Sequence, residues 1–116
     1  MTQNQRNDAA WPGTDGTEPL AAAEATRMAH AFHVLADAAR GRILSLASTD
    51  PDGITVKALV GELGLHQPTV SHHLKVLTDA GYLTRERRGT WSLYSPVPER
   101  LVELAELIAP RRAAAK

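Results

Sequence analysis

The sequence predicts a mainly α-helical protein with a small β-hairpin, arranged as a winged helix-turn-helix. Apolar residues recur at helical spacing in two adjacent segments, Val56 to Leu63 and Gln67 to Ala80. Gly64 separates them, and two helices joined by a short turn that contains glycine form a helix-turn-helix. Strand-forming residues on both sides of Gly89 then predict a hairpin. The predicted order is helix, helix, short strand, helix, helix, strand, strand, helix.

Composition indicates one domain without a strong overall charge. The chain has 116 residues, with 13 Lys or Arg against 13 Asp or Glu. Residues 54–96 carry five basic and three acidic side chains, so a modest basic excess lies on the predicted helix-turn-helix and hairpin. The absence of cysteine excludes disulfides and thiolate metal sites. No apolar run is long enough to cross a bilayer, and the start does not resemble a signal peptide, so we expect a cytoplasmic protein.

The chain before the helix-turn-helix is predicted to hold a tail and two helices. Residues 1–17 are polar, rich in glycine and proline, and expected to be disordered. A first helix is expected from Glu18 to about Asp37 and a second from Ala39 to about Ala47, with Asp37 as the cap of the second. Ile54 is expected to add a short strand to the hairpin. The winged helix-turn-helix domain is assigned to residues 18–110, and residues 111–116 form a basic tail.

The second helix of the helix-turn-helix has two different faces. Val70, Leu74 and Leu77 form an apolar stripe. The opposite face carries Thr69, His72 and Lys75, with Ser71 at its edge. Hydroxyl, imidazole and ammonium groups can bind phosphates and base edges, so this face predicts contact with double-stranded DNA. The segment Arg85 to Thr90 is expected to form a basic tip between the strands, as in a wing that reaches flanking phosphates or the minor groove.

The last helix, from about Glu99 to Ala109, is apolar on nearly every side. A small domain cannot bury such a helix alone, so we expect a partner helix from a second subunit. The residues expected at this dimer interface share one face of the helix: Leu101, Leu104, Ala105 and Ile108.

The run from Leu63 to Tyr94 resembles the ArsR/SmtB family of winged-helix repressors, and the run HVLADAARGRILSLA resembles that family's entry into its second helix. The resemblance implies a homodimeric repressor that binds an inverted-repeat operator and is released by an inducer, often a metal ion. It carries over a recognition-helix pattern at Gln67, Thr69, Ser71, His72 and Lys75, and a wing pattern at Arg87, Arg88 and Gly89. The sequence departs from the family at the cap residue His66, at Ala38–Ala39 and at Thr90.

Two histidines on the first helix suggest a metal site. His30 and His33 stand at i, i+3, and Asp37 follows one turn later. Glu103 and Glu106 of the last helix are expected to approach in a dimer. Imidazole and carboxylate ligands suit zinc, nickel or cobalt. The alternative is a solvated polar face on which Asp37 caps the next helix, with a non-metal inducer or none.

Other functions were weighed against a repressor. A winged-helix module that binds protein predicts an apolar or acidic recognition face, and this face is polar and mildly basic. An enzyme is not expected, because the sequence shows no nucleophile-base set, phosphate loop or HExxH motif. Among DNA-binding proteins, a winged-helix regulator of the MarR or PadR type is the alternative.

Overall fold

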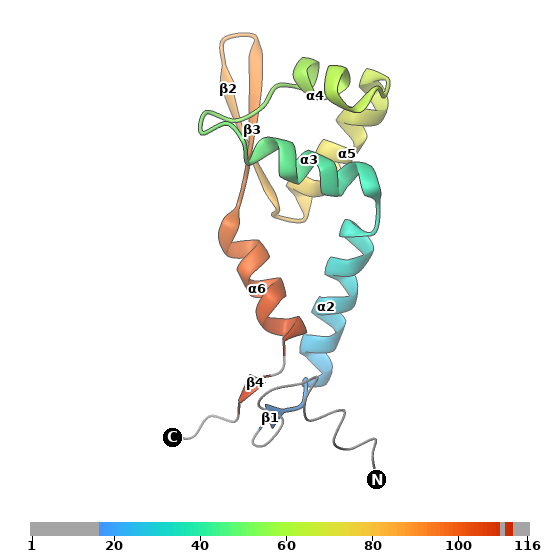
Figure 1. The fold of residues 1–116 in the computed structure, drawn as a ribbon, viewed down its shortest axis with the longest axis vertical. Coiled ribbons are helices and arrows are strands. Elements are labelled where there is room, and N and C mark those ends of the chain that lie inside the picture. The colour runs from blue at the N-terminus through green and yellow to red at the C-terminus, as the bar shows by residue number, and fades with distance from the viewer. Residues whose placement is uncertain (1–16, 110, 113–116) are drawn as a thin grey trace.

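The structure is a computed structural model, and it describes residues 17–109 and 111–112. In chain order, its elements are β1 (Thr17–Glu18), α2 (Ala22–Leu35), α3 (Ala38–Ala47), α4 (Val56–Leu63), α5 (Gln67–Asp79), β2 (Leu83–Arg88), β3 (Trp91–Pro96), α6 (Pro98–Ile108) and β4 (Arg111–Arg112). The predicted winged helix-turn-helix is confirmed (Figure 1). No helix of the described ranges is both long and apolar enough to span a membrane.

The core is centred where α3, α4, α5 and the base of the hairpin meet, and Val34 of α2 and Leu104 of α6 extend it. Its most deeply buried large side chains come from each of these elements: Ile43, Leu59, Val70, Leu74, Leu77 and Tyr82. The predicted apolar stripe of α5 is therefore confirmed as core. Burial of several such side chains, at about 1.5–3 kcal/mol each, provides the main stabilisation of this end of the molecule.

The short helix α4 begins and ends where its sequence predicts. Thr55 precedes it, and the Thr55 Oγ1 accepts a hydrogen bond from the Ala58 N–H at 3.1 Å. Gly64 follows it with φ +69°, a left-handed conformation that costs glycine little, and the Gly64 N–H donates to the Val60 carbonyl. The turn before α5 therefore follows from local chemistry.

The hairpin is longer than expected, and Ile54 joins it. Tyr94 exchanges two backbone hydrogen bonds of 2.9 Å with Ile54, which confirms the predicted third strand as an isolated bridge. Glycine is required beside this bridge, because a Cβ on Gly53 would lie 2.8 Å from the Ser95 Oγ and the residue has φ +99°. The loop before α4 is thereby held against β3.

The two ends of the described chain differ from the prediction. The first helix was expected from Glu18, but Thr17–Glu18 forms β1 and pairs antiparallel with β4, inside the segment assigned to the basic tail. The helix starts only at Ala22, and the Ala21 N–H donates to the Glu24 carboxylate at 3.0 Å. A strand pair between residues so far apart in sequence depends on where α6 returns the chain, so no local pattern predicts it.

Candidate nucleic-acid interface

The predicted recognition face of α5 lies on the outside of the molecule. Each of the five residues assigned to DNA on this helix is exposed: Gln67, Thr69, Ser71, His72 and Lys75. The opposite side of the helix is buried in the core. The position of this face in the fold therefore leaves its hydroxyl, imidazole and ammonium groups accessible to a DNA groove.

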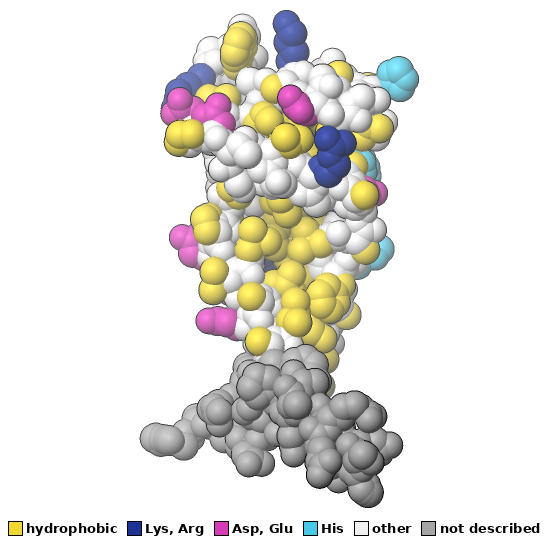
Figure 2. Space-filling view, in the orientation of Figure 1, with side chains coloured by type: hydrophobic (Ala, Val, Ile, Leu, Met, Phe, Trp, Pro, Cys, Tyr) yellow, Lys and Arg dark blue, Asp and Glu magenta, His cyan; other side chains and the backbone are white. Residues whose placement is uncertain are grey.

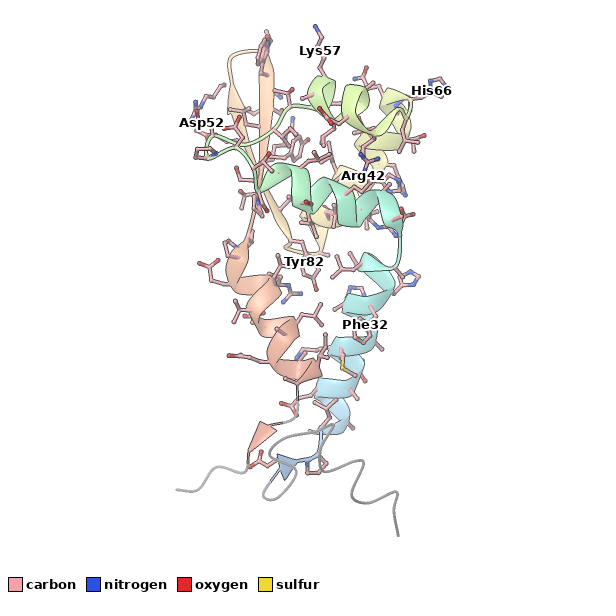
Figure 3. The ribbon with its side chains drawn as sticks, in the orientation of Figure 1. Phe32, Arg42, Asp52, Lys57, His66 and Tyr82 are labelled. Carbon is pink, nitrogen blue, oxygen red and sulfur yellow. The ribbon has the colours of Figure 1, made fainter. Side chains whose placement is uncertain are left out.

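The amino-terminal end of α5 is open to an anionic partner. His66 occupies the cap position with an extended backbone, and its side chain makes no capping hydrogen bond (Figure 3). Pro68 lies in the first turn of α5, where a backbone N–H would have no partner within the helix. The unpaired N–H groups of a first turn and the helix dipole together favour a phosphate. The weaker cap predicted from His66 therefore leaves backbone donors available.

Lys75 is held beside the helix by a weak contact. Its Nζ lies 3.0 Å from the Asp79 Oδ2, and the two side chains are 74% and 65% exposed. Exposed pairs of this kind contribute about 0–1 kcal/mol and are screened by salt. Exchanging Asp79 for a DNA phosphate or base edge therefore costs little.

The wing carries its arginines on a strand and not on a loop. The prediction of a tip from Arg85 to Thr90 is wrong, because β2 extends to Arg88 and pairs there with Trp91. Only Gly89 and Thr90 make the turn, and Gly89 supplies φ +62°. The extended strand follows from its ladder of hydrogen bonds to β3, which outweighs the low strand preference of charged residues.

The arginines of β2 have different partners. The Arg88 Nε lies 3.3 Å from the Glu86 Oε2, and the Arg85 Nε donates to the Ser92 Oγ at 3.0 Å. Within the described residues, the Arg87 guanidinium has neither an ion pair nor a hydrogen bond. All three side chains are exposed, so the wing presents a basic edge to a partner.

The wing tip and the helix-turn-helix lie at one end of the molecule. Figure 1 shows the β2–β3 turn, α4 and the start of α5 at this end, while α2 and α6 extend to the other. Lys57 on α4 projects from the same end (Figure 3), is exposed, and was not assigned to DNA from the sequence. A signal for it existed, since the first helix of a helix-turn-helix crosses the DNA backbone.

A partly buried pair of hydrogen bonds from Arg40 connects the recognition helix to α2 and α3. The Arg40 Nε donates to the Val34 carbonyl at 2.6 Å, and its Nη1 lies 3.1 Å from the His73 Nδ1. A guanidinium can only donate, so the His73 Nδ1 accepts. His73 is 8% exposed, so its role is structural.

Arg100 fixes the carboxyl end of α5, a role that no pattern in the sequence predicts. Its Nε donates to the Ala80 carbonyl at 3.2 Å, its Nη1 pairs with the Glu103 carboxylate, and its guanidinium carbon stands 5.4 Å from the centre of the Tyr82 ring. The orientation of α5 is therefore tied to both α2 and α6.

The residues predicted to bind a metal do not assemble in one chain. His30, Glu103 and Glu106 line a cavity of about 600 Å³ between α2 and α6, but His33 and Asp37 do not line it. Across the described ranges, no three His, Asp or Glu side chains form a group able to hold a metal ion. The predicted five-residue set therefore does not fit a metal within a single subunit.

Asp37 has a different role, which the sequence also raised. Its Oδ1 accepts a hydrogen bond from the Ala39 N–H at 2.8 Å, so it caps α3. This hydrogen bond, with smaller effects from His73 and Arg40, holds the pKa of the Asp37 carboxyl below its usual value.

The predicted dimer residues divide into two groups. Leu104 is 9% exposed and belongs to the core of the single chain, so it offers little surface to a second subunit. Leu101 is half-buried against the same core, whereas Ala105 and Ile108 are exposed. The helix buries Leu104 because α6 packs against α2 of its own chain, which the helical pattern alone does not show.

The sequence is similar to those of known transcriptional regulators. A family model described as "Bacterial regulatory protein, arsR family" matches residues 37–85. An uncharacterised HTH-type transcriptional regulator of Methanocaldococcus jannaschii is 34% identical over 82 residues, which are 71% of this chain and 91% of that protein.

Two solved structures extend the comparison. The structure of the AntR antimony-specific transcriptional repressor matches with a TM-score of 0.67 and 29% identity, over 82% of this chain and 86% of that one. A homodimeric winged helix-turn-helix domain from Mycobacterium bovis, described as a possible ArsR-family regulator, matches with a TM-score of 0.60 and 24% identity, over 78% of this chain and 85% of that one.

Proposed function

The chain belongs to the ArsR family of bacterial regulatory proteins and is a DNA-binding transcriptional regulator, and we propose that it acts as a homodimeric repressor on an inverted-repeat operator. Proteins of this family are transcriptional regulators, so the chain is not an enzyme. The MarR or PadR alternative is wrong for the same reason. The observation that carries the repressor proposal is the exposed polar face of α5 beside the basic wing.

Direct readout is assigned to α5 and positioning to the wing. Thr69, His72 and Lys75 meet base edges in the major groove, and Ser71 and Gln67 stand at the margins of the same face. Arg87 and Arg88 bind phosphates, which adds affinity without reading sequence. The α5 helix is held by Arg40 and Arg100, so it enters the groove with little loss of side-chain and backbone freedom.

Self-association is proposed from the exposed apolar residues at the other end of the molecule. Val102, Ala105 and Ile108 follow one side of α6, and Phe32 of α2 is 44% exposed. Figure 2 shows hydrophobic side chains gathered over α2 and α6 on the visible face. The related domain from Mycobacterium bovis is homodimeric, which supports the same arrangement here. Two recognition helices must then be spaced by about one turn of DNA, roughly 34–36 Å.

Selection from a random-sequence duplex pool tests this proposal. The wild-type protein should enrich an inverted repeat, and the complex should contain two chains by light scattering. Arg87→Ala should weaken binding to all sequences alike and reduce the slope of log affinity against log salt by about one unit. Recovery of no enriched duplex would contradict the repressor, and a single-site motif bound by one chain would contradict the dimer.

Nickel or zinc as the inducer stays a prediction of the sequence. Because residues 17–109 and 111–112 of one chain bring no three such ligands together, we expect a metal site that uses His30 and His33 to take donors from a second chain. Calorimetry with each metal should compare the wild type with the double variant His30→Ala/His33→Ala. Equal binding by both would reject these ligands, and no binding by the wild type would leave a regulator that does not sense these metals.

A further inference from the structure

Trp91 is the most exposed of the large hydrophobic side chains that the structure describes, at 65%. Single exposed apolar residues are common and need no explanation by themselves. The position of Trp91 distinguishes it from the other exposed apolar residues. It is the first residue of β3 and directly follows the Gly89–Thr90 turn. The indole therefore stands at the tip of the wing, the part that is directed at DNA.

The hairpin register places Trp91 beside a cation. Trp91 pairs with Arg88 across the strands, and directly paired residues share a face of a sheet. The next pair, Arg87 with Ser92, lies on the opposite face. One face of the tip therefore presents an indole next to a guanidinium, and the other presents the guanidinium of Arg87.

We propose, as an extension of the repressor function above, that Trp91 is a specificity-determining contact that enters the minor groove beside the bases read by α5. The Trp91 Nε1–H is a donor only. A·T pairs show only acceptors in the minor groove, whereas G·C pairs add the guanine amino donor. An indole at this position therefore favours A·T pairs in the flanks of the operator. Arg88, on the same face, binds the adjoining phosphates.

The Trp91 contact and the Arg88 contact should affect DNA binding in different ways, because only Arg88 is charged. The indole is neutral, so its loss changes affinity and flank preference without changing the number of ions released on binding. Loss of the Arg88 guanidinium should instead reduce the number of ions released on binding and leave the flank preference unchanged. The two side chains are neighbours on one face, so each is a matched control for the other.

The first experiment uses the duplex that the wild-type protein enriches from a random pool. Trp91→Ala should lower affinity about tenfold, within the range for one base-edge contact, and lose the A·T preference in the flanks. Trp91→Phe should keep part of the affinity but lose the A·T preference, because phenylalanine has no donor. Both should keep the wild-type salt slope, whereas Arg88→Ala should reduce it by about one unit.

The second experiment measures the solvent exposure of the Trp91 indole by fluorescence quenching. The chain has two tryptophans, so Trp11→Phe leaves Trp91 as the only one, and Trp11 lies outside the described residues. Acrylamide should quench the fluorescence of this protein strongly when it is free and weakly when the selected duplex saturates it. Unchanged quenching, or wild-type flank preference in Trp91→Phe, would overturn the inference. Failure of the wild type to enrich any duplex would instead reject the repressor function on which it rests.

Discussion

Single residues in this protein take roles that their surroundings decide. Asp37 was weighed as a metal ligand and as a helix cap, and its hydrogen bond to the Ala39 N–H decides for the cap. His72 and His73 are neighbours in sequence, yet His72 is exposed and the buried His73 accepts a hydrogen bond from Arg40. A residue type therefore predicts its role here only together with the helix face on which it lies.

The cap formed by Asp37 should make stability depend on acid. A carboxyl whose pKa is lowered by folding stabilises the protein above its unfolded pKa, and this contribution is lost as the pH falls through the folded pKa. Asp37→Asn should therefore melt below the wild type at pH 7, and the difference should shrink on acidification to about pH 3. Thermal unfolding followed by circular dichroism measures this. Asp52→Asn in the exposed loop is the control, and an equal shift in both variants would reject the cap as the cause.

Removal of Asp79, the ion-pair partner of Lys75, should leave the DNA affinity of the protein unchanged or raise it. Lys75→Ala should weaken binding to the selected duplex by about 1–3 kcal/mol if it meets a base edge. Asp79→Asn releases Lys75 from its ion pair and removes a negative charge, so it should bind as tightly as the wild type or more tightly. Filter binding or fluorescence anisotropy compares the two. A loss of affinity in Asp79→Asn would mean that the pair positions Lys75 for DNA.

At the scale of elements, the recognition helix is the best supported part of the chain. Its beginning is set by the Gly64 turn and Pro68, and its inner face by the core. Arg40 joins its middle, at His73, to α2, and Arg100 joins its carboxyl end, at Ala80, to α6. These hydrogen bonds connect α5 directly to both α2 and α6.

The turn between α4 and α5 should depend on the backbone of Gly64. A Cβ there would meet no atom within 4 Å, so Gly64→Ala is opposed only by its left-handed conformation, φ +69°. This should cost about 1–2 kcal/mol of folding stability. A Cβ on Gly61, inside α4, would also meet no atom within 4 Å. Gly61→Ala should therefore raise folding stability by about 0.5–1 kcal/mol. Urea unfolding of both variants checks the opposite signs, and a neutral Gly64→Ala would show that the turn relaxes.

At the scale of the whole molecule, two surfaces of different chemistry lie at opposite ends. The wing tip and helix-turn-helix form one end, and α2 and α6 carry exposed apolar residues toward the other (Figures 1 and 2). A dimer joined through the apolar end leaves both recognition helices free. The two surfaces can therefore be altered separately.

Substitutions in α6 should separate dimerisation from folding. Ile108→Glu places a charge on the 48% exposed residue and should give monomers that keep their helical content. Leu104→Ala removes a side chain from the core and should instead lower the stability of the fold by about 2–5 kcal/mol. Light scattering and urea unfolding measure the two effects. An Ile108→Glu protein that stays dimeric would place the interface elsewhere.

The helix-turn-helix was determined by the sequence alone. Apolar spacing, the Thr55 cap, the Gly64 stop and Pro68 are all local signals, because a helix satisfies its hydrogen bonds within itself. They predicted the bounds of α4 and the start of α5, and with them the exposed face assigned to DNA.

Only the tertiary structure decided the parts that depend on distant segments. The length of β2, the pairing of β1 with β4, the burial of Leu104 and the positions of Arg40 and Arg100 each require a partner far along the chain. A strand takes its hydrogen bonds from another strand, and a helix face is buried only if a neighbour covers it. The sequence therefore determined which helix presents an exposed polar face, and the packing of α2, α3 and α6 around it decided how that helix is held.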